Sequence, residues 1–144
     1  MPVIYLPDRG VVAVAGADAR PFLNGLVTAD MDKVAPGTPA FAALLSPQGK
    51  ILCDFFIVEA AVEDGGGFYL DCPRVLTEDL IQRLTMYRLR AQVGIADMSG
   101  TLGVGASVAP AQYDPEEWLA YGDPRLPALG MRLIGPREVL AALG

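Results

Sequence analysis

A single carboxylate interrupts an apolar, strand-like row in the stretch ILCDFFIV, residues 51–58. Side chains along a strand alternate between two faces, so Asp54 shares a face with Leu52, Phe56 and Val58. An ionised carboxylate among apolar neighbours loses solvation and needs hydrogen-bond donors, a charged partner or a raised pKa. Carboxylates at ligand pockets have this profile. Partial exposure of this face, or an ion pair with an arginine, explains the pattern equally well, and the residues alone leave both interpretations open.

Other stretches that could carry chemistry favour structural roles. The glycines at 65–67 join two predicted strands, and GVGAS at 103–107 lies inside a strand, so neither has the strand–loop–helix context of a phosphate-binding loop. The acidic pair at 78–79 suits a helix start, and Arg88 and Arg90 suit a helix end. One of these arginines could instead meet an anionic ligand. We assign no catalytic residue and no metal ligand from the sequence.

Composition narrows the class of protein. The 144 residues are 52% hydrophobic and 19% charged, which is typical of one folded domain with a substantial core. A net charge of −6 argues against direct binding to nucleic acid, and the absence of histidine excludes His-based nucleophile triads within this chain. No apolar run is long enough to span a bilayer. The first ten residues lack the features of a secretory signal, so we predict a cytoplasmic protein with Cys53 and Cys72 reduced and buried.

The elements that must position Asp54 follow from local patterns. Ser46-Pro47-Gln48-Gly49 carries type I turn chemistry between two apolar runs, which predicts a hairpin whose second strand holds Asp54. Further strands are predicted at 3–6, 10–15, 68–72, 91–97, 101–108 and 131–134, and helices at 18–27, 74–88 and 136–144. Residues 109–130 contain two Asp-Pro steps and are predicted to be an irregular connection. The order predicts an α+β fold with a mainly antiparallel sheet and two principal helices.

Five stretches of the chain resemble a known family. They are GADARPFLNGLVTADM, LLSPQGKILCDFFIV, FYLDCP, MYRLRAQVGIADMS and DPRLPALGMRL, and they span most of Val11 to Leu133. In this order and spacing they resemble YgfZ-type proteins, the folate-binding, iron–sulfur cluster assembly relatives of the glycine-cleavage aminomethyltransferase, the T protein. The resemblance implies sheet-and-helix domains arranged in a ring, with folate in the central channel.

The resemblance also implies a role for the carboxylate in the apolar row. In the T protein, the aspartate that faces folate lies in an Asp-Asp pair; Asp54 matches the second member of this pair, and Cys53 replaces the first. The next strand lines the same pocket in the family. The folate-binding residues that the resemblance implies are Leu52, Asp54, Phe56, Leu70 and Asp71. Tetrahydrofolate is the implied cofactor.

One departure from the family pattern is clear. Members carry a later Lys-Gly-Cys-Tyr-x-Gly-Gln-Glu signature that this sequence lacks, so we expect residues 1–144 to be a single folate-binding-type domain, the N-terminal half of such a protein. The expected function is that of a tetrahydrofolate-binding accessory protein for iron–sulfur cluster assembly or repair, indirectly linked to tRNA modification.

Two alternatives stay open. One is an aminomethyltransferase that moves a one-carbon unit to tetrahydrofolate, although we expect the chain not to be an independent enzyme. The other is a truncated half-protein that acts only in a dimer or complex. The expected partners are a folate-type small molecule, iron–sulfur enzymes and a second copy of the chain, with no direct nucleic-acid or membrane partner.

Overall fold

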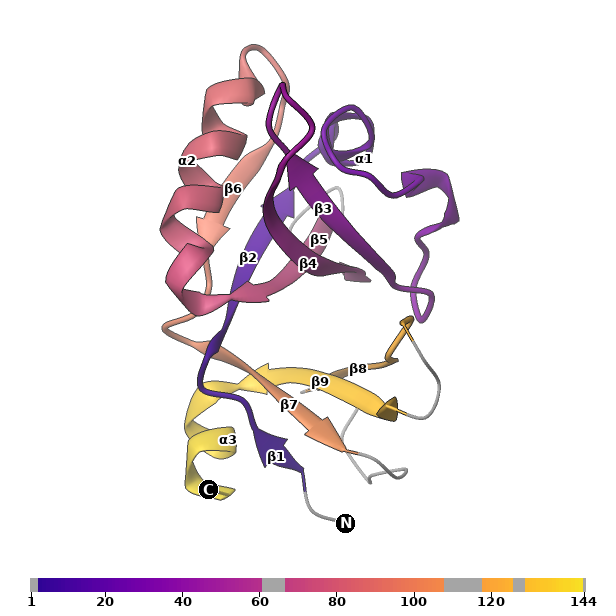
Figure 1. Ribbon diagram of the computed structural model, residues 1–144. Coiled ribbons are helices and arrows are strands. Elements are labelled where there is room, and N and C mark those ends of the chain that lie inside the picture. Colours follow the sequence, from indigo (N-terminus) through magenta and orange to yellow (C-terminus); the bar gives the residue numbers. More distant parts are fainter. Residues whose placement is uncertain (1–2, 61–66, 108–117, 126–128, 144) are drawn as a thin grey trace.

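Within the described residues, the chain forms two antiparallel sheets stacked face to face (Figure 1). The computed structural model describes residues 3–60, 67–107, 118–125 and 129–143. The first sheet has the strand order β3-β4-β5-β2-β6, and the second has the order β1-β7-β9-β8. The strands are β1 Ile4–Tyr5, β2 Arg9–Ala15, β3 Ala40–Leu45, β4 Ile51–Ala60, β5 Gly67–Pro73, β6 Gly94–Asp97, β7 Leu102–Ser107, β8 Leu119–Gly122 and β9 Met131–Pro136.

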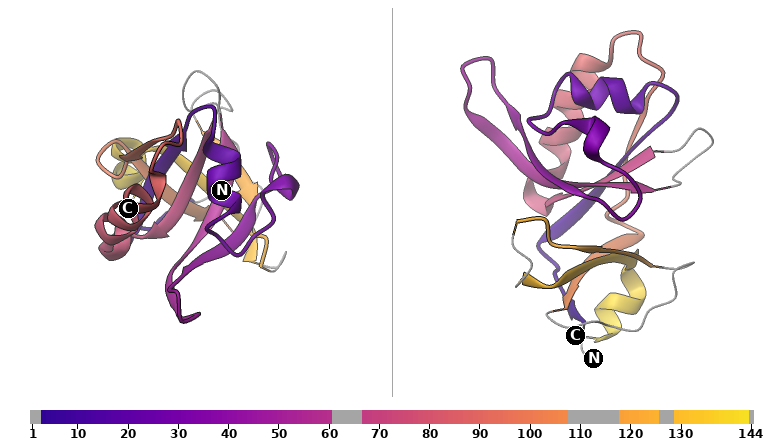
Figure 2. Two further views of the ribbon diagram at one scale, coloured as in Figure 1. Left: turned by 90° about the horizontal axis from the view of Figure 1, so that it is seen from above. Right: turned by 90° about the vertical axis from the view of Figure 1, so that its right-hand side faces the viewer.

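Helices cover the two outer faces of this stack. The α-helices are α1 Ala19–Asn24, α2 Thr77–Arg88 and α3 Arg137–Leu143, and the short 3-10 helices are η1 Met31–Lys33 and η2 Arg74–Leu76. Figure 2 shows α1 and α2 on the side of the first sheet that is turned away from the second sheet. Helix α3 packs on β7 and β1 at the opposite end of the molecule (Figure 1). The predicted α+β fold with antiparallel pairing is confirmed, and its strands are divided between two sheets.

Two apolar cores follow from this arrangement. The larger one lies between the first sheet and the helices, and β4 contributes Cys53, Phe55 and Ile57 to it. The smaller one lies between the sheets, and β4 contributes Phe56 and Val58 to it. Strand alternation therefore divides β4 between a helix-facing side and a side that looks toward the second sheet. Asp54 belongs to the second side.

The hairpin that carries Asp54 forms as predicted. The N–H of Gly49 donates to the carbonyl of Ser46 at 2.9 Å, and Gly49 has a φ of 85°, which a glycine adopts without strain. The pairing shifts by one residue between Leu44 and Leu45, as a bulge next to such a turn requires. Beyond the bulge, Asp54 pairs with Ala43. The turn thus sets the register that decides which side chains of β4 face the second sheet.

The first predicted helix differs from the structure mainly at its end, and the second differs at its start. The helix predicted for 18–27 is shorter, because the chain after α1 leaves the helix and Val27 pairs with Leu44 of β3. The side chain of Asp18 does not cap α1 and accepts a hydrogen bond from the N–H of Gln92 at 2.8 Å instead. The helix predicted for 74–88 is present, with its first turn tightened into η2.

The prediction of an irregular connection at 109–130 is wrong for part of that range. Residues 119–122 form β8, which pairs with β9 and buries Tyr121 between the sheets. Proline and Asp-Pro steps flank these four residues without removing their ladder hydrogen bonds, so they did not prevent pairing. Residues 108–117 and 126–128 of the predicted connection lie outside the described residues. No helix in the described ranges is both long and apolar enough to cross a membrane.

Candidate functional site between the two sheets

Asp54 lies half-buried on the face of β4 that looks toward the second sheet. Phe56, the next residue on that face, is buried in the core between the sheets. In the described part of the chain, the Asp54 carboxylate accepts no hydrogen bond and forms no ion pair. A carboxylate that is partly removed from water and lacks donors is free to bind a ligand that brings N–H groups.

Arg125 is a cation that interacts electrostatically with this carboxylate. Its Nη2 and Nε donate to Asp123 at 2.7 and 3.0 Å, and its guanidinium carbon lies 4.9 Å from the centre of the Phe56 ring and 5.6 Å from that of Phe41. The hydrogen bond to Asp123 raises the pKa of Arg125, and the negative charge of Asp54 raises it further. Since β3 and β8 are both edge strands, these residues lie at the margin of the interface between the sheets.

Asp71 has the opposite environment. It is fully buried, and its Oδ1 accepts from Nε of Arg9 at 2.8 Å. Its Oδ2 accepts from Nε of Arg132 at 2.9 Å and from the hydroxyl of Tyr121 at 2.8 Å. Burial raises the pKa of Tyr121 well above its ordinary value, so the phenol stays a hydrogen-bond donor. Because Arg132 and Tyr121 belong to the second sheet, this cluster joins the two sheets.

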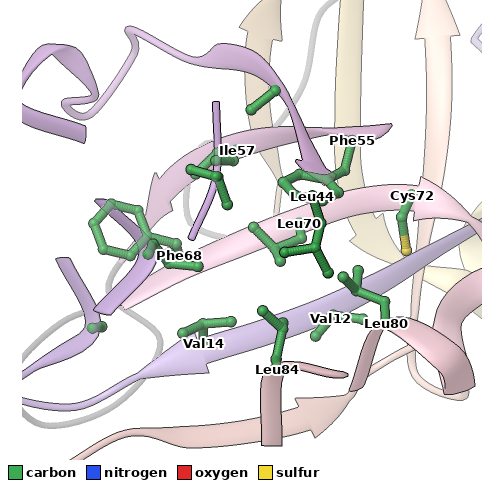
Figure 3. Packing of buried hydrophobic residues seen from close by; sticks show 14 of the residues in the cluster. Val12, Val14, Leu44, Phe55, Ile57, Phe68, Leu70, Cys72, Leu80 and Leu84 are labelled. Carbon is green, nitrogen blue, oxygen red and sulfur yellow. The ribbon is translucent and has the colours of Figure 1, made fainter. Parts of the chain in front are cut away.

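The structure brings four of the five predicted folate residues to one face. Leu52, Asp54 and Phe56 alternate along the same side of β4, and Asp71 pairs with Phe56 on the neighbouring strand. Leu70 does not join them. It is buried in the core beneath α2, on the other side of the first sheet, as Figure 3 shows. Leu70 and Asp71 are consecutive on one strand and therefore point to opposite faces.

The residues that sequence reasoning did not assign to the site come from β3 and from the segments around β8 and β9. They are Phe41, Tyr121, Asp123, Arg125 and Arg132. One local signal was available. In Asp123-Pro124-Arg125, an aspartate two residues before an arginine can accept the backbone N–H at that position, and here it does so at 2.9 Å. Nothing local indicated that this arginine lies over two phenylalanines from another sheet.

Both cysteines are free and buried, as predicted. Burial raises the pKa of Cys53 to about 11 and that of Cys72 to about 12, so both thiols are protonated at neutral pH. Cys53 also points into the helix-side core, away from Asp54. Within the described residues, no group of three or more Cys, Asp or Glu side chains could hold a metal ion.

A cavity of about 360 Å³ lies elsewhere, on the helix-facing side of the first sheet, beside α1. Its polar residues are Arg20 and Glu59, which form an ion pair at 2.7 Å. Nη1 of Arg20 also donates to the backbone carbonyls of Met31 and Val34. These contacts tie η1 to β4, and they leave this cavity without a free carboxylate like that of Asp54.

Comparison with known proteins identifies the relatives of the chain. No family model matches it. It is 32% identical over 138 residues to the mitochondrial iron–sulfur cluster assembly factor IBA57 homolog of Pyricularia oryzae, covering 92% of this chain and 35% of that protein. It is 30% identical over 149 residues to iron–sulfur cluster assembly factor IBA57 of Mus musculus, covering 90% of this chain and 41% of that protein. The chain is therefore similar to IBA57 assembly factors over about nine-tenths of its own length.

A solved structure shares the fold of this chain. Glycine cleavage system aminomethyltransferase T from Bartonella henselae matches with a TM-score of 0.76 over 99% of this chain and 44% of the other, at 14% identity. The predicted resemblance to assembly-factor relatives of the aminomethyltransferase is therefore confirmed, with the structural match showing the fold alone. The chain spans little more than a third of the length of the curated relatives, 35% and 41%.

One prediction is contradicted by these relatives. The names of both IBA57 proteins describe them as mitochondrial, against the cytoplasmic location predicted here. The prediction rested on the lack of a secretory signal, and such a signal differs in composition from a mitochondrial transit peptide, so its lack did not bear on the choice. Neither name mentions folate or tRNA, and these parts of the predicted function stay predictions.

Proposed function

We propose that this chain is the ligand-binding portion of an iron–sulfur cluster assembly factor, and that it binds a tetrahydrofolate-type molecule at the margin between its two sheets. The homologous assembly factors and the aminomethyltransferase fold support the class of protein. The half-buried Asp54 carboxylate, which has no hydrogen-bond or ion-pair partner among the described residues, is the observation that carries the ligand site.

The chemistry of this margin suits a pterin ring. The ring is flat and apolar on its faces and carries amino and amide donors at its edge. Phe41 is 41% exposed and lies 5.1 Å, centre to centre, from Phe56, so the margin offers an aromatic surface next to the carboxylate. Apolar contact then supplies most of the affinity, and Asp54 orients the ring edge. A hydrogen bond from a ring N–H to the charged carboxylate contributes about 1.5–3 kcal/mol.

The role we propose is accessory, and it does not use the cysteines as ligands of a cluster. Cys53 and Cys72 are buried in the helix-side core, and this burial raises their pKa values and disfavours the thiolate, the form that binds iron. Cluster chemistry would then belong to the iron–sulfur proteins that the assembly factor serves. We therefore propose a ligand-binding role for the chain and no role as a cluster carrier.

Titration calorimetry with tetrahydrofolate tests the site. Asp54→Asn keeps the shape of the side chain and removes its charge, so we expect binding to weaken by about ten- to a hundredfold, at about 1.4 kcal/mol per factor of ten. Asp32→Asn is the matched control, because it removes one carboxylate from an exposed position on η1. Equal affinity of the wild type and Asp54→Asn would contradict the role of Asp54, and no binding to the wild type would contradict the proposed function.

A further inference from the structure

Three arginines surround the ring of Phe56, and they are held in different ways. The guanidinium carbons of Arg132, Arg125 and Arg9 lie 4.5, 4.9 and 5.8 Å from the ring centre. Arg132 and Arg9 are each tied to the fully buried Asp71. Arg125 is not tied to that cluster. Of these three guanidinium groups, two are fixed by ion pairs with Asp71, and the third, at the margin between the sheets, is paired with Asp123.

Arg125 is hydrogen-bonded to its own segment and contacts the first sheet without a described hydrogen bond to it. Within the part of the chain that the structure describes, its hydrogen bonds and its ion pair all go to Asp123, two residues before it. Among the described residues, its interactions with the first sheet are the contacts with the rings of Phe41 and Phe56 and the longer-range attraction of the Asp54 and Asp71 charges, with no ion pair to that sheet. The side chain of Arg125 is 43% exposed, whereas that of Asp123 is 2% exposed. Arg125 can therefore leave the rings without breaking an ion pair between the sheets.

The group that covers the rings resembles one edge of the proposed ligand. A guanidinium is planar, stacks on aromatic faces and points its N–H donors outward in its own plane toward carboxylates. The 2-amino-pyrimidinone part of a pterin has the same N–C–N pattern with an attached amino group. Both would lie against the Phe41 and Phe56 rings, which are inclined at 53° to each other. Arg125 directs its N–H groups to Asp123, and a pterin at the same rings would direct its own toward Asp54.

We propose that Arg125 is an internal stand-in for the ligand, which occupies the aromatic surface beside Asp54 and must move off Phe56 when a ligand binds. The inference rests on the proposed folate-type site and specifies its selectivity. The site favours flat heterocycles with an amino-amidine edge, because these replace each contact that the guanidinium gives up. Heterocycles with a carbonyl at the same position would place a second oxygen against the Asp54 carboxylate and are disfavoured.

A pair of matched ligands and a pair of matched variants test this inference by calorimetry. Pterin carries the 2-amino group, and lumazine carries a carbonyl in its place. Asp123→Asn/Arg125→Met removes the guanidinium without leaving a bare buried carboxylate. Asp79→Asn/Arg83→Met is the control, since it removes an ion pair of similar arginine exposure from α2. Arg125→Lys is a second variant, which keeps the charge near Asp123 and loses the planar group.

We expect Asp123→Asn/Arg125→Met to bind pterin about three- to thirtyfold more tightly than the wild type, the range that one guanidinium–ring contact supplies. Arg125→Lys should change in the same direction by a smaller factor, the control should match the wild type, and pterin should bind better than lumazine throughout. Circular dichroism would establish that each variant is folded.

Equal or weaker pterin binding by both Arg125 variants would overturn the inference, as would a lack of preference for pterin over lumazine or a lack of pterin binding by every protein. These results are distinguishable from failure of the proposed function. If tetrahydrofolate binds the wild type and Asp54→Asn loses it, the proposed function stands even when Arg125 proves to have no such role. If the Arg125 variants bind pterin more tightly than the wild type does, while tetrahydrofolate does not bind the wild type, only the proposed function fails.

Discussion

Asp71 and Asp54 lie on the same face of neighbouring strands, yet their surroundings are opposite. Asp71 pairs across the ladder with Phe56, and Asp54 lies two residues from Phe56 along β4. Asp71 is fully buried and accepts hydrogen bonds from three side chains, whereas Asp54 is half-buried and accepts none among the described residues. A carboxylate in an apolar row can therefore be structural or free to bind a ligand, and only its hydrogen-bond and ion-pair partners distinguish the two roles.

The difference follows from position in the stack. Asp71 faces the point where β8 and β9 cross the first sheet, so arginine and tyrosine side chains from the second sheet reach it. Asp54 pairs with Ala43 of β3, which is an edge strand of the first sheet. The strand of the second sheet on this side is β8, which is also an edge strand. A buried carboxylate without donors would destabilise the fold, so the interior position had to be satisfied by the protein. The carboxylate at the margin did not need donors from the protein, since water reaches it.

The largest expected effect is on the buried cluster. Asp71→Asn keeps the shape of the side chain but leaves Arg9 and Arg132 without a counter-charge, so we expect the free energy of unfolding to fall by about 3–5 kcal/mol. Urea unfolding followed by circular dichroism measures it, with Asp54→Asn as the comparison. A loss below about 1 kcal/mol would show that Asp71 is not the clamp between the sheets.

A smaller effect is expected from the phenol of Tyr121. Tyr121→Phe keeps the ring that packs 6.2 Å, centre to centre, from Phe56 and removes only the hydroxyl that donates to Asp71. Losing one buried hydrogen bond to a charged group should lower the free energy of unfolding by about 1.5–3 kcal/mol. The same urea experiment tests it. A variant as stable as the wild type would mean that the two arginines alone satisfy Asp71.

The smallest expected effect on stability is at Asp54. Because no described group donates to its carboxylate, Asp54→Asn should change the free energy of unfolding by no more than about 0.5 kcal/mol. Thermal and urea unfolding of this variant, compared with Asp71→Asn, would separate a residue kept for binding from one kept for folding. If Asp54→Asn instead destabilised the protein as much as Tyr121→Phe, Asp54 would have a structural partner and the contrast would disappear.

Much of the fold could be predicted from local patterns. The turn at Ser46 to Gly49 set the hairpin and its bulge, and the apolar stripe after Arg74 indicated α2. These elements depend on contacts between near neighbours in the sequence, and such contacts can be predicted from local sequence patterns. Strand β8 was not predicted, because its pairing with β9 depends on a distant partner and its flanks are rich in proline.

The candidate site shows the same division. By itself, the sequence determined that Asp54 stands in an apolar row, that alternation puts it on one face with Leu52 and Phe56, and that its strand follows a turn. Only the tertiary structure decided which aspartate is free. Tyr121 and Arg132 are 50 and 61 residues away from Asp71 in the chain, and they meet it because the two sheets stack. Donors that arrive from so far leave no local pattern, so the partnered and unpartnered carboxylates look alike until the sheets are in place.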